Sequence, residues 1–242
     1  MPPRGRNHLS FLMSVSYANG GMNYDLIIFD CDGTLVDSEY LCNKIIVSML
    51  AEFGLPQYDV GYAMKNFVGL SAPVAFERVA VESGKKLPSD VVKIYERRVN
   101  ENMAEGLRFI DGVPETLAEL HEAFDMCVGS NGERSTVLLS LQHAGISHYF
   151  PEHAVFTKAQ VVNPKPAPDL YFLAAREMGA DPTRTLVVED SVAGVKAGKA
   201  AGMRTIGLTA TYHDKESHGV ALRSAGADHV IDRFIHIADC LG

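Results

Sequence analysis

From Tyr24 onward, short apolar runs alternate with segments of helical periodicity. The first run, 26–29, is continuously apolar, which is typical of a strand covered on both faces. Four later runs have the same character, and helical spacing fills the intervals between them. This alternation predicts an α/β fold in which a doubly wound parallel sheet carries helices on both faces. The later strands are expected at 126–128, 154–156, 186–188 and 205–208, and the helices at 114–123, 133–144, 168–178 and 192–201.

One long stretch, residues 38–107, interrupts the alternation because it shows helical periodicity and no convincing strand. Apolar residues four apart at positions 41–53 predict a first helix. Ser71 is a candidate N-cap for a second helix that ends near Gly84, and Ser89 is a candidate N-cap for a third. A helical block between the first strand and the rest of the sheet predicts an inserted second domain, which we call the cap.

These patterns divide the chain into three parts. Residues 24–37 and 108–242 are expected to form the α/β core, and 38–107 the helical cap. In residues 1–23, an apolar run behind two arginines loosely resembles a signal peptide, but serines interrupt it and a strand follows closely. We expect a disordered extension there, or a true start at Met22. Because such sheets bind ligands at the carboxyl ends of their strands, a cap placed after the first strand would cover the site.

Acidic side chains cluster at the end of the first predicted strand. Asp30 and Asp32 are expected on the same side of the sheet, because side chains alternate along a strand. Two adjacent carboxylates repel each other unless they share a cation or a proton. Gly33 and Thr34 follow in a tight turn, whose free amides predict an anion cradle. On this motif alone, a turn with solvated acids explains the same residues.

Three further strand ends carry polar side chains. Ser130 and Asn131 follow the second core strand, Lys165 lies between prolines in a rigid turn, and Glu189 and Asp190 end a later strand. Each alone has an ordinary explanation as a helix cap, a solvated lysine or a helix-start acid pair. Together they predict a phosphoryl-transfer site. Carboxylates at this density need a hard divalent cation, and oxygen ligands select Mg²⁺. A phosphomonoester dianion needs that cation and the lysine to approach.

The combined pattern resembles the four motifs of the haloacid dehalogenase superfamily of phosphatases. The resemblance spans residues 24–231 and implies a Rossmann-like core. The helical insertion resembles the small cap of the subgroup that holds beta-phosphoglucomutase and sugar-phosphate phosphatases. The four motifs are Asp30-x-Asp32-Gly-Thr-Leu-Val-Asp37-Ser, Ser130, Lys165-Pro-x-Pro and Glu189-Asp190-Ser.

The resemblance implies a role for each matching residue. Asp30 would attack phosphorus and form an aspartyl-phosphate, and Asp32 would protonate the leaving alcohol and then activate water. The catalytic residues would be Asp30, Asp32, Ser130 and Lys165. The Mg²⁺ site would comprise Asp30, Asp32 (through its backbone carbonyl), Glu189 and Asp190. The substrate-binding residues would be Gly33, Thr34, Ser130, Asn131, Lys165 and, in the cap loop, Gly69.

The expected activity is Mg²⁺-dependent hydrolysis of a small phosphomonoester, either a sugar, a sugar-acid or a polyol phosphate. A phosphosugar mutase of the beta-phosphoglucomutase type is the alternative. By resemblance, that mutase uses a cap histidine, a lysine and an arginine where this chain has Cys42, Val68 and Ala72. A receiver-like phospho-acceptor domain is a remote alternative, which the helical insertion disfavours. A halide-releasing dehalogenase is excluded, because that branch does not need the second acid and Asp32 is present.

Composition narrows the class of partner. A chain that is 47% hydrophobic and 21% charged is typical of a globular protein, and no apolar run approaches the roughly 18–20 residues of a membrane span. The net charge of −8, with no basic block, argues against a nucleic-acid partner. The four scattered cysteines are expected to be reduced thiols. We therefore expect a cytoplasmic monomer or weak dimer that binds a small-molecule phosphate ester and neither nucleic acid nor membrane.

Overall fold

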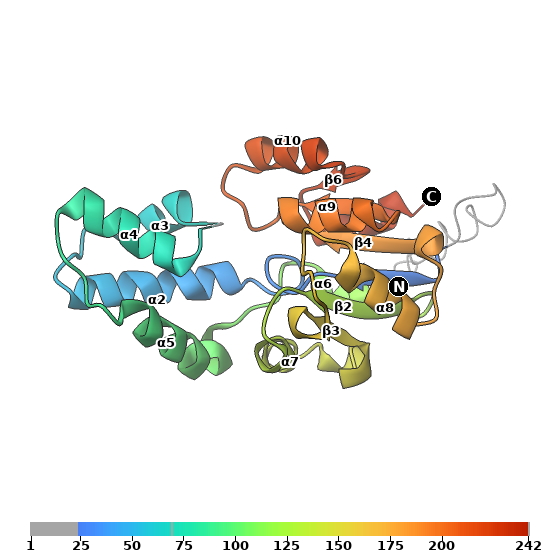
Figure 1. The fold of residues 1–242 in the computed structure, drawn as a ribbon, viewed down its shortest axis with the longest axis horizontal. Coiled ribbons are helices and arrows are strands. Elements are labelled where there is room, and N and C mark those ends of the chain that lie inside the picture. Colours follow the sequence, from blue (N-terminus) through green and yellow to red (C-terminus); the bar gives the residue numbers. More distant parts are fainter. Residues whose placement is uncertain (1–23, 69, 242) are drawn as a thin grey trace, which may run out of the picture.

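A computed structural model describes residues 24–68 and 70–241. The predicted extension at 1–23 and the predicted substrate contact Gly69 lie outside the described residues. The core is a six-stranded parallel sheet with the strand order β3-β2-β1-β4-β5-β6 (Figure 1). This confirms the predicted α/β class. The strands are β1 (Leu26–Phe29), β2 (Asp125–Ser130), β3 (Val155–Thr157), β4 (Thr185–Glu189), β5 (Arg204–Leu208) and β6 (His229–Ile231).

Helices cover both faces of the sheet because the strand side chains alternate between two apolar clusters. Ile27 and Phe29 face a cluster that includes side chains of α6, α7 and the short 3-10 helix η5. Leu26 and Ile28 face the opposite cluster, with side chains of α8 and α9. The helices are α6 (Val113–Leu120), α7 (Arg134–His143), α8 (Asp169–Glu177), α9 (Val192–Ala200), α10 (Lys215–Ala225) and η5 (Phe234–Cys240).

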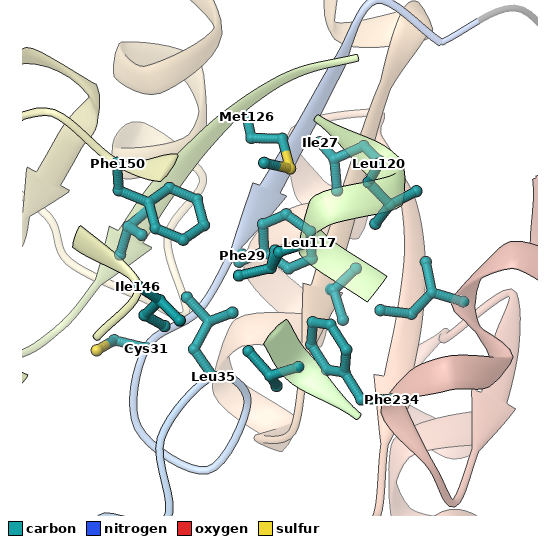
Figure 2. Packing of buried hydrophobic residues seen from close by; sticks show 14 of the residues in the cluster. Ile27, Phe29, Cys31, Leu35, Leu117, Leu120, Met126, Ile146, Phe150 and Phe234 are labelled. Atoms are coloured by element: carbon teal, nitrogen blue, oxygen red, sulfur yellow. The ribbon is translucent and has the colours of Figure 1, made fainter. Parts of the chain in front are cut away.

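Phe29, the last residue of β1, lies in the middle of the first cluster. Its ring meets Phe150 edge-on at 6.0 Å between centroids and stacks on Phe234 at 5.8 Å. Figure 2 shows these rings together with Leu117 of α6 and with Cys31, which points into the same packing. The core therefore holds the end of β1 firmly at the point where the acidic motif begins.

The four helices of the predicted cap pack on one another around their own apolar cluster. They lie beyond the carboxyl end of β1 (Figure 1). The two chain connections to them run side by side, because the Asp37 amide donates to the Arg108 carbonyl at 2.8 Å and Val36 bridges Phe109. The helices are α2 (Ser38–Glu52), α3 (Val60–Asn66), α4 (Ala72–Ser83) and α5 (Val91–Gly106). The domain boundaries assigned from the sequence stay a prediction.

Details of the cap differ from the sequence-based expectations. The seven-residue helix α3 was not predicted. Ser71 is the N-cap residue of α4, but its side chain makes no capping hydrogen bond. Helix α5 begins at Val91, two residues after the predicted cap Ser89, and its Ile94 amide bonds the Asp90 carbonyl. Across the described residues, no helix is both long enough and apolar enough to cross a membrane. All four cysteines are free.

Candidate active site

The strand order brings the predicted site residues to one edge of the sheet. Strand β1 lies between β2 and β4, so residues that follow these three strands are neighbours. The Asp30 amide extends the ladder by donating to the Val188 carbonyl at 2.9 Å. Ser130 ends β2, and Glu189 ends β4 with Asp190 directly after it. The acidic motif and the two later motifs therefore meet at the carboxyl ends of the strands.

Lys165 lies inside this cluster although it comes from a loop. Its Nζ is 2.7 Å from Asp30 Oδ1 and 2.6 Å from Glu189 Oε1, and only 3% of its side chain is exposed. The loop holds it from behind, because Asn131 Oδ1 accepts from the Lys165 amide and Asn131 Nδ2 donates to the Lys165 carbonyl. The Lys165–Pro166 peptide is cis. The Asn131 side chain thus anchors Lys165, and a substrate contact by Asn131 stays a prediction.

Three buried carboxylates gather around Lys165. One oxygen from each of Asp30, Glu189 and Asp190 lies within 4.8 Å of the others. Burial lowers the pKa of Lys165, but the charges of Asp30 and Glu189 outweigh this effect and keep its pKa raised. The ammonium therefore stays charged. When all three carboxylates are ionised, a single ammonium leaves this group with two negative charges, which suits a divalent cation bound by oxygen ligands.

Burial and repulsion between neighbouring carboxylates raise the pKa values of two members of this group. Burial raises the pKa of Asp30 to about 7, with Lys165 lowering it and Glu189 raising it. Burial raises the pKa of Asp190 well above its usual value, and the charges of Glu189 and Asp30 add to the shift. Lys165 therefore does not offset the full cost of ionising these buried carboxyls, and a further positive charge would stabilise their ionised forms.

Glu189 is held by four donors. Its Oε1 accepts from Lys165 and from the Tyr171 hydroxyl at 3.0 Å, and its Oε2 accepts from the Ser191 amide and hydroxyl at 2.9 Å each. Helix α9 leaves room for this carboxylate because residue 194 is glycine. A Cβ there would lie 1.7 Å from Glu189 Oε1. The orientation of Glu189 is therefore fixed by its surroundings.

Gly33 and Thr34 lie against Asp190, and their turn does not leave both backbone amides free as expected. The Gly33 amide donates to the Val36 carbonyl at 2.9 Å, so the prediction of a free amide at Gly33 was wrong. The turn folds back on itself in a short bridge and consumes that donor. Gly33 has a φ of 84°, and a Cβ on it would lie 2.2 Å from Asp190 Oδ2. The Thr34 hydroxyl donates to Asp190 Oδ1 at 3.4 Å.

The side chains of Asp32 and Ser130 both lie close to Gly132, because a Cβ there would be 3.7 Å from Asp32 Oδ2 and 3.2 Å from Ser130 Oγ. Asp32 is exposed, whereas Asp30 is 8% exposed, and the Ser38 side chain at the start of α2 bonds the Asp32 carboxyl. Ser130 is buried, and its Oγ accepts from the Gly132 amide at 3.0 Å. Because that contact uses only a lone pair, the Ser130 hydroxyl hydrogen remains available to an anion. An exposed acid beside a buried acid suits proton transfer to a bound ligand.

Three residues of the site were missed at the sequence level. Tyr171 of α8 bonds Glu189, and Tyr212 and His218 both bond Asp190. The sequence does carry a signal for Tyr171, since this residue lies in the helix expected at 168–178, shortly after Lys165. Tyr212 and His218 follow β5 and belong to no motif, so nothing local in the sequence connects them to Asp190.

Comparison with known proteins adds independent findings. A profile of the haloacid dehalogenase-like hydrolase family matches residues 27–208. The 6-phosphogluconate phosphatase of Escherichia coli K12 is 33% identical over 192 residues, which cover 79% of this chain and 85% of that protein. A phosphoglycolate phosphatase of Haemophilus influenzae Rd is 34% identical over 227 residues, covering 90% of this chain and 98% of that protein.

A solved structure shares both the fold and part of the sequence. It is a haloacid dehalogenase family hydrolase from Deinococcus radiodurans R1 with bound phosphate and sodium. The two chains are 32% identical, the TM-score is 0.77, and the match covers 91% of this chain and 98% of the other. The likeness therefore extends over the sheet and the helical insertion together.

Proposed function

The chain belongs to the haloacid dehalogenase-like hydrolase family, and on this premise we propose that it hydrolyses a small phosphomonoester through an aspartyl-phosphate on Asp30. The relatives named as phosphatases confirm the expected enzyme class, a phosphoric monoester hydrolase. One observation carries the proposal: Lys165 bridges Asp30 and Glu189 inside a buried group of three carboxylates. That arrangement holds a nucleophile beside positive charge where a phosphoryl group would enter.

The proposed reaction has two steps. First, an Asp30 carboxylate oxygen attacks phosphorus, the bond from phosphorus to the ester oxygen breaks, and Asp32 gives its proton to the departing alcohol. Second, Asp32 takes a proton from a water molecule that attacks phosphorus, and the bond to Asp30 breaks to release phosphate. Asp32 suits this exchange because it is exposed to a ligand and because burial of its carboxyl raises its pKa, against the lowering by Ser38, which favours the protonated form that the first step needs.

Residues of this chain would offset the negative charge on the phosphoryl group during its transfer. Lys165 and the Ser130 hydroxyl are the residues we assign to the phosphoryl oxygens. Asp30, Asp190 and the main-chain carbonyl of Asp32 would hold Mg²⁺, with Glu189 beside them. When bound, this ion supplies positive charge that offsets the phosphoryl oxygens and the acidic cluster. The surplus of buried negative charge around Lys165 supports this assignment.

We infer that helices α2–α5 act as a cap over the site, because the Ser38 side chain of α2 bonds Asp32 directly. By the resemblance to beta-phosphoglucomutase, a second phosphate would lie beside Val68 and Ala72, which carry no charge. This favours a phosphatase over a mutase. The proposed substrates are sugar, sugar-acid or polyol phosphates, and the similarity to the 6-phosphogluconate phosphatase favours the sugar-acid class. We further propose a cytoplasmic monomer or weak dimer with no nucleic-acid partner, consistent with the net charge of −8.

The proposal is tested by measuring phosphate release with Mg²⁺ over a panel of sugar phosphates, sugar-acid phosphates, phosphoglycolate and nucleotides. We expect turnover of at least one sugar or sugar-acid phosphate, and weaker turnover of nucleotides. An Asp30→Asn variant serves as the control for contaminating phosphatases. A purified, folded protein that releases phosphate from none of these compounds contradicts the proposed function.

A further inference from the structure

Two aromatic rings outside the four motifs stack on each other beside Asp190. Tyr212 lies in the loop after β5, and His218 lies in the first turns of α10. Their ring centroids are 3.4 Å apart and the planes differ by 10°. Each ring therefore limits the movement of the other, although they come from different segments.

Both rings hold Asp190, and they do so at different atoms. The Tyr212 hydroxyl donates to Asp190 Oδ2 at 3.3 Å. His218 Nε2 lies 2.6 Å from the Asp190 main-chain carbonyl oxygen. A carbonyl oxygen only accepts hydrogen bonds, so Nε2 must carry the proton in this contact. Together with the Thr34 hydroxyl on Oδ1, these contacts restrain both carboxylate oxygens and the backbone of Asp190. The contacts of both rings are made to Asp190, so their effect on the reaction would pass through that residue.

We propose that Tyr212 and His218 form a stacked pair of positioning residues that orient Asp190 for binding a divalent cation. This inference rests on the proposed function, because it assigns Asp190 to the Mg²⁺ site. Residues that hold a metal ligand in orientation commonly change metal affinity by about 10- to 100-fold when they are altered. The pair extends the metal site to a loop and a helix that the motifs do not include.

The test is Mg²⁺ affinity of the full chain, measured by titration calorimetry without substrate. Tyr212→Phe keeps the stacked ring and removes only the hydroxyl, and we expect about 10-fold weaker binding. Tyr149→Phe makes the same chemical change at a ring that contacts His121 and His148, and it should bind Mg²⁺ like the wild type. In steady-state assays, Tyr212→Phe should need more Mg²⁺ for half-maximal rate while its substrate KM at saturating Mg²⁺ stays unchanged.

His218 gives a second measurement that does not depend on the tyrosine variant. His218→Gln retains an N–H donor that can reach the Asp190 carbonyl, whereas His218→Leu has none. We expect Mg²⁺ affinity to fall in the order wild type, His218→Gln, His218→Leu. Circular dichroism in EDTA identifies any variant that fails to fold. The Mg²⁺ affinities of the folded variants then test the inference.

Two outcomes overturn the inference and can be told apart. If the wild type binds Mg²⁺ and the folded Tyr212 and His218 variants match it within about twofold, the positioning role is wrong while the metal site stands. If the folded wild type binds no Mg²⁺, both the inference and the proposed metal site are wrong. Weakened binding in Tyr212→Phe and His218→Leu, with Tyr149→Phe unchanged, supports the inference.

Discussion

At the scale of single residues, Lys165 determines how much negative charge the site can hold. Its ammonium contacts two of the three clustered carboxylates, and Asn131 anchors its backbone through two hydrogen bonds. The sequence predicted Lys165, because a lone lysine between prolines recurs in a known motif order. It did not predict the contacts around Lys165, because they depend on a loop closing over the ends of two strands. A short motif identifies a residue but not its neighbours.

Lys165→Ala is expected to lower kcat/KM by about 100-fold or more, because contacts to a developing oxyanion contribute roughly 3–4 kcal/mol. It also leaves the buried carboxylates without their ammonium, so the free energy of unfolding should fall. Lys158→Ala is the matched control, since Lys158 pairs with Glu133 at 2.9 Å on the surface. Steady-state kinetics with both variants check this prediction. A loss in kcat/KM below about threefold for Lys165→Ala would mean that Lys165 has no role in catalysis.

Gly33 offers a second residue-scale prediction. Gly33→Ala places a methyl group 2.2 Å from Asp190 Oδ2 at a φ of 84°. We expect Mg²⁺ affinity and kcat/KM to fall by about 10-fold or more, because Asp190 must move. Gly202→Ala separates this effect from backbone strain, since Gly202 has a φ of 73° with nothing within 4 Å of its Cβ position. That control should lose only about 1–2 kcal/mol of stability and retain full activity. Wild-type Mg²⁺ affinity in Gly33→Ala would contradict the close packing of Asp190.

At the scale of secondary-structure elements, strongly patterned segments were predicted and weakly patterned ones were missed. The continuous apolar run of β1 predicted a buried central strand, and all four of its residues are buried. Strand β6 has three half-buried residues, and α3 has seven residues with only Ala63 buried, so neither carries a clear hydrophobic period. Tertiary packing forms such elements. The same holds for Tyr212 and His218, whose role depends on where α10 docks.

The prediction that separates a phosphatase from a mutase rests on Val68, in the loop after α3, and on Ala72, the first residue of α4. A second phosphate beside Val68 and Ala72 would lack a cation, and one charge-assisted contact contributes about 1.5–3 kcal/mol. We therefore expect free phosphate from glucose 1-phosphate or glucose 6-phosphate, if either is turned over, and no interconversion of the two. Phosphorus NMR distinguishes the products. Efficient isomerisation with little free phosphate would favour the mutase.

At the scale of the whole molecule, the sheet and the four cap helices meet at the site through Ser38 and Asp32. The core supplies a rigid base, because the ends of β1, β2 and β4 are fixed by two apolar clusters. The helices α2–α5 pack around a cluster of their own and join the core through two adjacent connections, and α5 also contacts α7 of the core. The sequence predicted a helical insertion from periodicity alone, and the boundaries of that domain and the side chains that select a substrate stay predictions.

Metal removal tests the charge balance of the whole site. EDTA should abolish phosphate release, and added Mg²⁺ should restore it, because the buried carboxylates then regain their missing positive charge. Mg²⁺ should also raise the Tm in a concentration-dependent way, since it binds the folded state selectively. Thermal unfolding and phosphate-release assays on the same preparation check both effects. Full activity in excess chelator would contradict the metal assignment.

The most direct test of the central claim is to locate the phosphoryl group during turnover. A reaction with Mg²⁺ and a substrate identified in the panel is quenched in acid within the first turnover, and its peptides are mapped by mass spectrometry. We predict a phosphoryl adduct on Asp30 that decays as phosphate appears, and Asp30→Asn should be folded, inactive and free of the adduct. Rapid phosphate release with no adduct on Asp30, or more than a few per cent of wild-type activity in Asp30→Asn, would contradict the account.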